Sequence, residues 1–210
     1  MDKNVIPVSL MDEECEICSC FNPLLERRTL LKAALGMVLG LPFIDPALAQ
    51  PTSPTAAPPE EGDQFVFAFG DKKGEIITPK DLPLGGPQVM AYPMDPKTKV
   101  VKDGSRLNKI IIIHLDPIEL SEETRAHSVE GIVAYSAICT HQGCDVTEWK
   151  SKEKVFLCPC HESEFDPKNE AQVVHGPASR RLAALPLKLV EGALVAAGGF
   201  IGSIGPRRSY

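Results

Sequence analysis

The chain has 210 residues, of which 43% are hydrophobic and 24% charged, and its 22 basic and 28 acidic residues give a formal net charge of −6. The normal apolar fraction excludes a fully disordered or collagen-like chain. The acidic balance lacks the basic excess expected of a nucleic-acid binder. The length suffices for one domain of ordinary size with appendages, so we expect a globular protein that does not bind nucleic acid.

Residues 1–49 have the order of features found in an export signal. Glu26-Arg27-Arg28-Thr29-Leu30-Leu31-Lys32 resembles the twin-arginine signal, an apolar run follows over residues 30–44, and Ala47-Leu48-Ala49 fits a cleavage site. This run is shorter than the roughly 20 residues that span a bilayer. We therefore expect a cleaved signal, with a retained anchor as the alternative. Either places the protein in the periplasm or at the periplasmic face of the inner membrane.

Residues 50–62 contain four prolines among alanine, serine and threonine, a composition that predicts an extended linker. The domain then covers residues 63–210. Its short apolar runs are often β-branched or aromatic and are separated by glycine, proline and aspartate, which favours many short strands in a sandwich or small barrel. We expect these strands at residues 65–69, 89–92, 110–115, 132–136, 154–157, 182–190 and 193–196.

One helix is predicted between Asp116 and His127. Asp116 can cap it, Pro117 suits its first position, and Glu119 completes an Asp-x-x-Glu capping box. The predicted fold class is all-β with this single short helix.

Four cysteines and two histidines gather in two short segments. The first loop is Cys139-Thr140-His141-Gln142-Gly143-Cys144, and the second loop, Cys158-Pro159-Cys160-His161-Glu162-Ser163, follows after 13 residues. A disulfide site alone would leave both histidines unexplained, and a tetrahedral zinc site would use four of the six candidates. Both are less economical than an iron–sulfur site in which two irons take two thiolates and two imidazoles.

Three further cysteines, at positions 15, 18 and 20, precede the arginine pair of the export signal. A Cys-x-x-Cys-x-Cys run can bind a metal or a chaperone. With no histidine or second cysteine pair nearby, a discarded leader is the favoured interpretation.

The two loops resemble the cluster-binding motifs of Rieske proteins, Cys-x-His and Cys-x-x-His, and Gly176-Pro177-Ala178 resembles the proline loop that covers the cluster in that family. We call these three residues the third loop. The resemblance implies a 2Fe–2S cluster in an antiparallel β-sandwich, with a cluster-binding subdomain at about residues 134–182 and the histidines at an exposed tip. The implied ligands are Cys139 and Cys158 for one iron, and His141 and His161 for the other.

The resemblance also implies a disulfide between Cys144 and Cys160, a pairing that suits an exported protein because disulfides persist outside the cytoplasm. Gly176 and Pro177 are expected to cover the cluster. Ser163 is expected to donate a hydrogen bond to a bridging sulfide, and Phe165 stands where high-potential members carry a tyrosine. A phenyl ring cannot donate a hydrogen bond, so we expect a reduction potential below that of a mitochondrial-type Rieske protein.

The implied function is electron transfer between partner proteins, with no substrate chemistry by this chain alone. The first hypothesis is a periplasmic small subunit similar to that of arsenite oxidase, with a catalytic oxidoreductase subunit and a cytochrome as partners. The alternative is the Rieske subunit of a quinol-oxidising cytochrome bc complex, which needs a retained anchor and a mobile hinge. Gln142 and Glu162 make the tip more polar than in quinol-oxidising members, which favours the first hypothesis.

Overall fold

The computed structural model describes residues 53–207. The export signal, the anchor alternative and the cysteines at 15, 18 and 20 lie outside the described residues. Within the described part, no helix is both long enough and apolar enough to cross a membrane.

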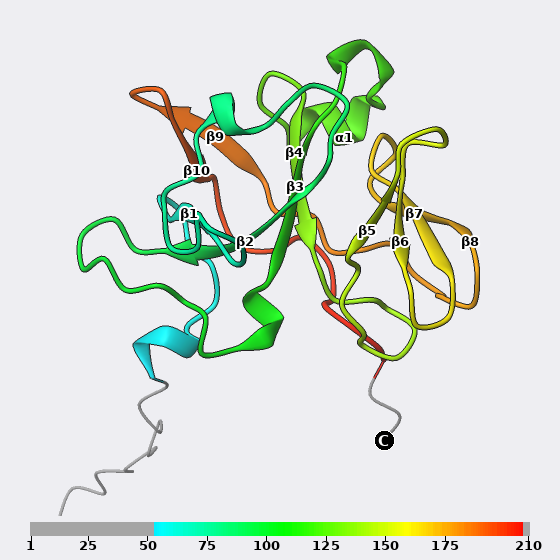
Figure 1. The fold of residues 1–210 in the computed structure, drawn as a ribbon, viewed down its shortest axis with the longest axis horizontal. Helices are drawn as coiled ribbons and strands as arrows, with labels where there is room; N and C mark the ends of the chain where they lie inside the picture. The colour runs from blue at the N-terminus through cyan, green and yellow to red at the C-terminus, as the bar shows by residue number, and fades with distance from the viewer. Residues whose placement is uncertain (1–52, 208–210) are drawn as a thin grey trace, which may run out of the picture. The chain divides into compact units, whose positions relative to one another are not determined.

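The described chain forms two antiparallel sheets (Figure 1). The large sheet has six strands in the order β4-β3-β2-β1-β10-β9, and the small sheet has four in the order β5-β6-β7-β8. This arrangement confirms the all-β fold class, although β5, β7 and β8 were not predicted. The strands are β1 (Gln64–Phe67), β2 (Val89–Met94), β3 (Ile110–His114), β4 (Ile132–Ser136), β5 (Glu148–Lys150), β6 (Val155–Cys158), β7 (Ser163–Asp166), β8 (Gln172–His175), β9 (Leu187–Val190) and β10 (Ala193–Ala196).

The isoleucine run of β3 joins the cores of the two sheets. Side chains of a strand alternate between its faces, so Ile110 and Ile112 enter the core of the large sheet beside Phe65. Ile111 and Ile113 enter a second core, which contains Phe156 and other side chains of the small sheet. All four isoleucines are fully buried. A strand buried on both faces needs a continuous apolar run, and this run fixes the small sheet against the large one.

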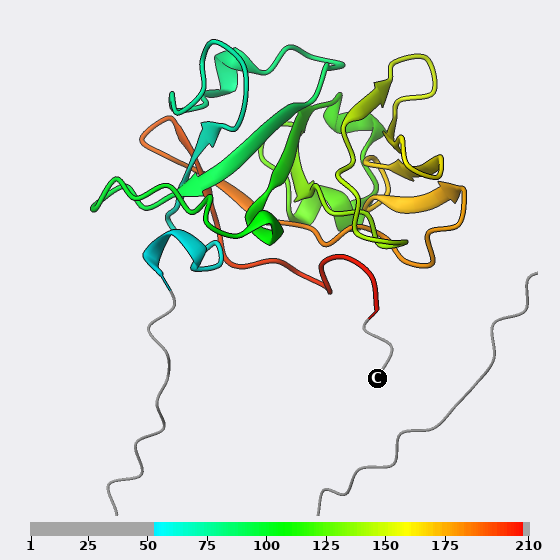
Figure 2. The ribbon, with the colours of Figure 1, turned by 60° about the horizontal axis from the view of Figure 1, so that its bottom comes forward.

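The two edges of the large sheet approach each other. The N–H of Leu185 donates to the carbonyl of Ala134 at 2.9 Å, and the N–H of Ser136 donates to the carbonyl of Ala183 at 2.8 Å. The segment before β9 therefore covers the free edge of β4, and the sheet curls around its core (Figure 2). Residues 182–185, which were predicted as part of one long strand with β9, lie outside it, and among them only Ala184 makes isolated bridges, to Tyr135 and Ile201.

The single helix predicted over residues 116–127 is wrong. Asp116 caps a 3-10 turn, and Ser121 begins a separate α-helix by accepting a hydrogen bond from the N–H of Thr124 at 3.1 Å. Leu120 lies between them in an extended conformation and is buried in the second core. Burial of Leu120 and capping by Ser121 thus divide the helix. The helical segments are η1 (Pro54–Ala56), η2 (Pro79–Asp81), η3 (Arg106–Asn108), η4 (Pro117–Glu119) and α1 (Glu122–Ala126).

Residues 53–62, the described part of the expected linker, lie against the domain. The side-chain amide of Asn108 donates to the carbonyl of Ala57 at 2.6 Å, and the N–H of Gly62 donates to the carbonyl of Ala196 at 2.9 Å. The ammonium group of Lys102 donates to the carbonyl of Pro58 at 3.1 Å. Pro54–Ala56 form the 3-10 helix η1, so the segment is not extended throughout, and these contacts hold it to the domain.

A buried ion pair fastens this segment. Lys102 Nζ lies 2.7 Å from Asp63 Oδ2, and the two side chains are only 6% and 5% exposed. The same carboxylate oxygen accepts a hydrogen bond from the N–H of Glu60 at 2.8 Å. Removing one member of a buried pair leaves the other charge uncompensated in a poorly solvated place.

We predict that Asp63→Asn lowers the free energy of unfolding by about 3–5 kcal/mol, because the Lys102 ammonium group loses its buried counter-charge and keeps only the exposed Glu60 carboxylate at 3.9 Å. Urea denaturation followed by circular dichroism measures the change. Asp103→Asn, at an exposed neighbouring carboxylate, is the matched control and should leave the unfolding midpoint almost unchanged. Equal effects of the two substitutions would contradict the role of the buried pair.

Candidate metal centre

The first and second loops are tight turns at neighbouring strand ends. In the first loop, the N–H of Cys139 donates to the carbonyl of Cys144 at 2.8 Å, and the N–H of Gly143 donates back to the carbonyl of Cys139 at 3.0 Å. Gly143 has a φ of 79°, which glycine adopts without strain. The second loop is the turn of the β6–β7 hairpin, where Cys158 pairs with Ser163.

A disulfide joins the two loops. Cys144 and Cys160 are bonded, with their Cα atoms 6.5 Å apart, which is the pairing that the resemblance implied. The sulfur atoms of Cys144, Cys158 and Cys160 lie within 4.8 Å of one another. The two bonded sulfurs are not available as thiolate ligands. Cys158 is therefore the free thiol beside the disulfide that joins the loops.

The four predicted ligands form two pairs, one of thiols and one of imidazoles. Cys139 and Cys158 are free and each is only 1% exposed. The rings of His141 and His161 lie with their centroids 4.7 Å apart and their planes at 90°. His141 is half-buried and His161 is exposed. The thiols therefore face the protein interior and the imidazoles face its surface.

These residues fit a two-iron cluster by their chemistry. Burial raises the pKa of the Cys158 thiol, and the adjacent Cys139 raises it further, so a Cys158 thiolate needs a nearby positive charge such as bound iron. His141 Nδ1 is buried without a hydrogen-bond partner in the described part of the chain. Two thiols and two imidazoles are the donor set of a mixed-ligand 2Fe–2S cluster. The individual ligand assignments stay predictions.

The third loop packs directly on the second. Gly176 has a φ of 85°, and a Cβ atom at this position would lie 2.6 Å from the carbonyl oxygen of Glu162 and from the Cα of Ser163. Only glycine allows this approach. The N–H of Ala178 donates to Ser163 Oγ at 3.2 Å, which leaves the hydroxyl hydrogen of buried Ser163 free to donate elsewhere. Pro177 is exposed on the outside of the loop.

Phe165 lies beneath the second loop. It is fully buried in the core that contains Cys139 and Cys158, and it pairs with Phe156 across β6 and β7. The phenyl ring therefore contributes apolar packing to the core that also contains both predicted thiolate ligands.

Three charged residues that the sequence analysis missed hold the first loop to the large sheet. Arg106 Nη2 donates to the carbonyl of Gly143 at 2.6 Å and to Asp145 Oδ1 at 2.9 Å, and Lys109 Nζ donates to Asp145 Oδ2. Burial would raise the pKa of Asp145, but hydrogen bonds from Lys109 and Arg106 outweigh it and the pKa is lowered. No local pattern links residues so far apart in the sequence.

The C-terminal segment holds the other side of the first loop. A Cβ on Gly143 would lie 3.3 Å from the ring of Pro206, and Arg180 Nη2 donates to the carbonyl of Gly205 at 2.6 Å. Thr140 Oγ1 in turn donates to the carbonyl of Arg180 at 2.5 Å. Figure 1 shows this segment, in red, running from the large sheet toward the lower end of the small sheet.

Comparison with known proteins identifies the same loops. The Rieske [2Fe-2S] domain family matches residues 80–186, just over half of the chain, and this region contains all three loops. The cytochrome bc1 complex Rieske iron-sulfur subunit of Streptomyces lividans is 41% identical over 99 residues, which are 46% of this chain and 58% of that protein. A Haloferax mediterranei protein, named as a respiratory nitrate reductase Rieske subunit, is 39% identical over 149 residues, covering 70% and 63% of the two chains.

The chain spans less than two thirds of the length of these curated relatives. Among solved structures, the soluble domain of Rieske protein II from Sulfolobus acidocaldarius is 21% identical, with a TM-score of 0.37, over 47% of this chain and 67% of that one. Since the family match covers both loops that carry the predicted donors, the chain belongs to the Rieske [2Fe-2S] domain family, and its cofactor is a Rieske-type 2Fe–2S cluster.

Proposed function

We propose that this electron-transfer protein is the Rieske subunit of a respiratory complex of the cytochrome bc type and that partners dock at its histidine tip. The observation that carries the proposal is the asymmetry of the site. His161 is exposed beside half-buried His141, whereas Cys139 and Cys158 are almost fully buried. A partner can thus approach closely only from the imidazole side.

The two kinds of donor have separate roles in this function. A cluster with two neutral imidazoles in place of thiolates is easier to reduce, with potentials in the range of about −150 to +300 mV. The ring nitrogen of His141 or His161 that does not bind iron can carry a proton. An exposed imidazole can therefore accept a proton from a hydroxyl group, as quinol oxidation requires, while the two free thiols stay buried in the protein core.

Relatives named as bc1 Rieske subunits support the bc-type complex. Besides the Streptomyces protein, the subunit of Corynebacterium diphtheriae is 49% identical over 74 residues, which are 35% of this chain and 18% of that protein. We propose a cytochrome subunit as the electron acceptor and quinol as the donor. We also propose export by the twin-arginine route to the periplasmic face of the inner membrane, on the sequence features of residues 1–49.

A second candidate, the small subunit of a periplasmic oxidoreductase similar to arsenite oxidase, is favoured by the polar tip. Gln142 and Glu162 are both exposed beside the histidines, and a carboxylate suits a hydrated protein surface better than an apolar quinone pocket. Residues 53–62 are also fixed to the domain by Asn108 and Lys102. They do not supply the hinge that a mobile bc-type subunit needs.

Purification of the tagged full chain from membranes of its own organism separates these candidates. The bc-type proposal predicts that b-type haem copurifies, seen in reduced-minus-oxidised spectra, and that quinol reduces the Rieske centre in the purified complex. Reduction by arsenite, with neither b-type haem nor reduction by quinol, would overturn it in favour of the second candidate. The intact mass of the purified chain tests removal of residues 1–49.

We predict that Phe165→Tyr raises the midpoint potential, because a hydroxyl in the core that contains the predicted thiolate ligands can donate a hydrogen bond that stabilises the more negative reduced state. A redox titration monitored by EPR measures the shift. Phe156→Tyr is the matched control, since Phe156 is equally buried in the same core on the neighbouring strand. An unchanged or lowered potential for Phe165→Tyr, or an equal rise in both variants, would count against the role of Phe165.

A further inference from the structure

We propose that Arg106, Lys109 and Asp145 form a charge-setting site that raises the midpoint potential of the Rieske centre. We call these three residues the cationic triad. The proposal rests on the presence of the 2Fe–2S cluster and not on which respiratory complex the chain serves. The triad is built from residues outside the predicted ligands and covering loops.

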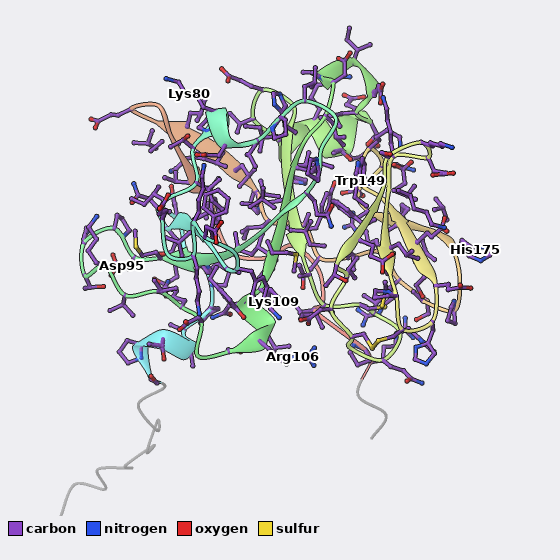
Figure 3. All side chains as sticks on the ribbon, in the orientation of Figure 1. Lys80, Asp95, Arg106, Lys109, Trp149 and His175 are labelled. Atoms are coloured by element: carbon purple, nitrogen blue, oxygen red, sulfur yellow. A yellow bond between two sulfur atoms is a disulfide. The ribbon has the colours of Figure 1, made fainter. Side chains whose placement is uncertain are left out.

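The contacts of the triad connect the large sheet to the first loop. Arg106 belongs to η3, Lys109 directly precedes β3, and Asp145 directly follows Cys144. Arg106 contacts both the carbonyl of Gly143 and the carboxylate of Asp145, whose second oxygen accepts from Lys109. In Figure 3, Arg106 and Lys109 lie at the same end of the domain, near the lower end of β3.

The triad carries an excess positive charge. Two cations share one carboxylate, so the three side chains sum to one positive charge in the immediate vicinity of the first loop. Lys109 is only 10% exposed and Asp145 is 28% exposed, whereas Arg106 is 58% exposed. Charges with little access to water are screened weakly and act over longer distances than surface charges.

Pairing alone does not account for both cations. The Lys109 ammonium group alone would satisfy the carboxylate of Asp145, yet the exposed Arg106 guanidinium shares the same carboxylate. Burying the Lys109 ammonium group costs free energy even when it is paired. The ring of Phe69 lies 5.4 Å from Lys109 Nζ and offsets part of this cost by a cation–π contact. Reduction adds one electron to the neighbouring cluster. The excess positive charge of the triad stabilises this added negative charge and so favours the reduced state.

Charge variants distinguish an electrostatic effect from loosening of the first loop. Arg106→Gln removes one positive charge and should lower the midpoint potential, whereas Asp145→Asn removes the negative charge and should raise it. Both substitutions break the same contact. The double variant Arg106→Gln/Asp145→Asn restores the net charge of the triad and should return the potential close to that of the unmodified protein.

The measurement is an EPR-monitored redox titration of the full chain with its cluster, at low and high salt, with thermal unfolding of each variant recorded in parallel. Arg106→Lys keeps the charge and should keep the potential. Lys72→Gln removes a cation that pairs with Asp81 of η2. Lys80, which is also in η2, lies far from Arg106 in Figure 3. This control should leave the potential unchanged.

Two results would overturn the proposal. If Arg106→Gln and Asp145→Asn shift the potential in the same direction and the double variant shifts it further, loop loosening is the cause. If neither single variant shifts it, the triad is not coupled to the centre. A wild-type protein with no Rieske EPR signal would instead refute the cofactor itself, so the two failures are distinguishable.

Discussion

The site depends on holding two loops, separated by 13 residues of sequence, so that their thiols are buried while their imidazoles stay accessible. The Cys144–Cys160 disulfide joins the loops covalently. The close approach of Gly176 to the backbone of Glu162 and Ser163 seats the third loop on the second. Because these contacts come from three separate segments, the donors can be positioned before iron binds. A preorganised site of this kind needs little rearrangement when an electron arrives or leaves.

The rest of the fold supplies the foundation for these loops. The isoleucines of β3 divide their side chains between two cores, so the small sheet that ends in the second loop is fixed against the large sheet. The first loop leaves β4, the strand paired with β3, and Arg106 and Lys109 tie it back to the residues just before β3. The C-terminal segment packs on its other side through Pro206. The same strand pair therefore sets the position of both loops.

Sequence reasoning was most successful where the physical signal is local. The strands around Ile110–His114 and Ile132–Ser136 are continuous apolar runs, and the cysteine and histidine spacing sufficed to predict the cofactor. The strands β5, β7 and β8 are short and mix charged or polar with apolar residues, as in Glu148-Trp149-Lys150, so they form through pairing within the small sheet and not through a local pattern. Burial of Leu120 likewise overrides the helix signal that begins at Asp116. The contact between Arg106 and Asp145 could not be predicted because only the folded sheet brings them together.

The central claim is that two imidazoles and two thiolates hold the cluster at the junction of the first and second loops. Pulsed EPR of the reduced protein, compared with protein labelled with 15N only in histidine, tests it most directly. We predict two strongly coupled nitrogen nuclei that change with the label, and the loss of one of them, or of the cluster, in His141→Cys and in His161→Cys. Strong coupling to no histidine nitrogen in the wild-type protein would contradict the account.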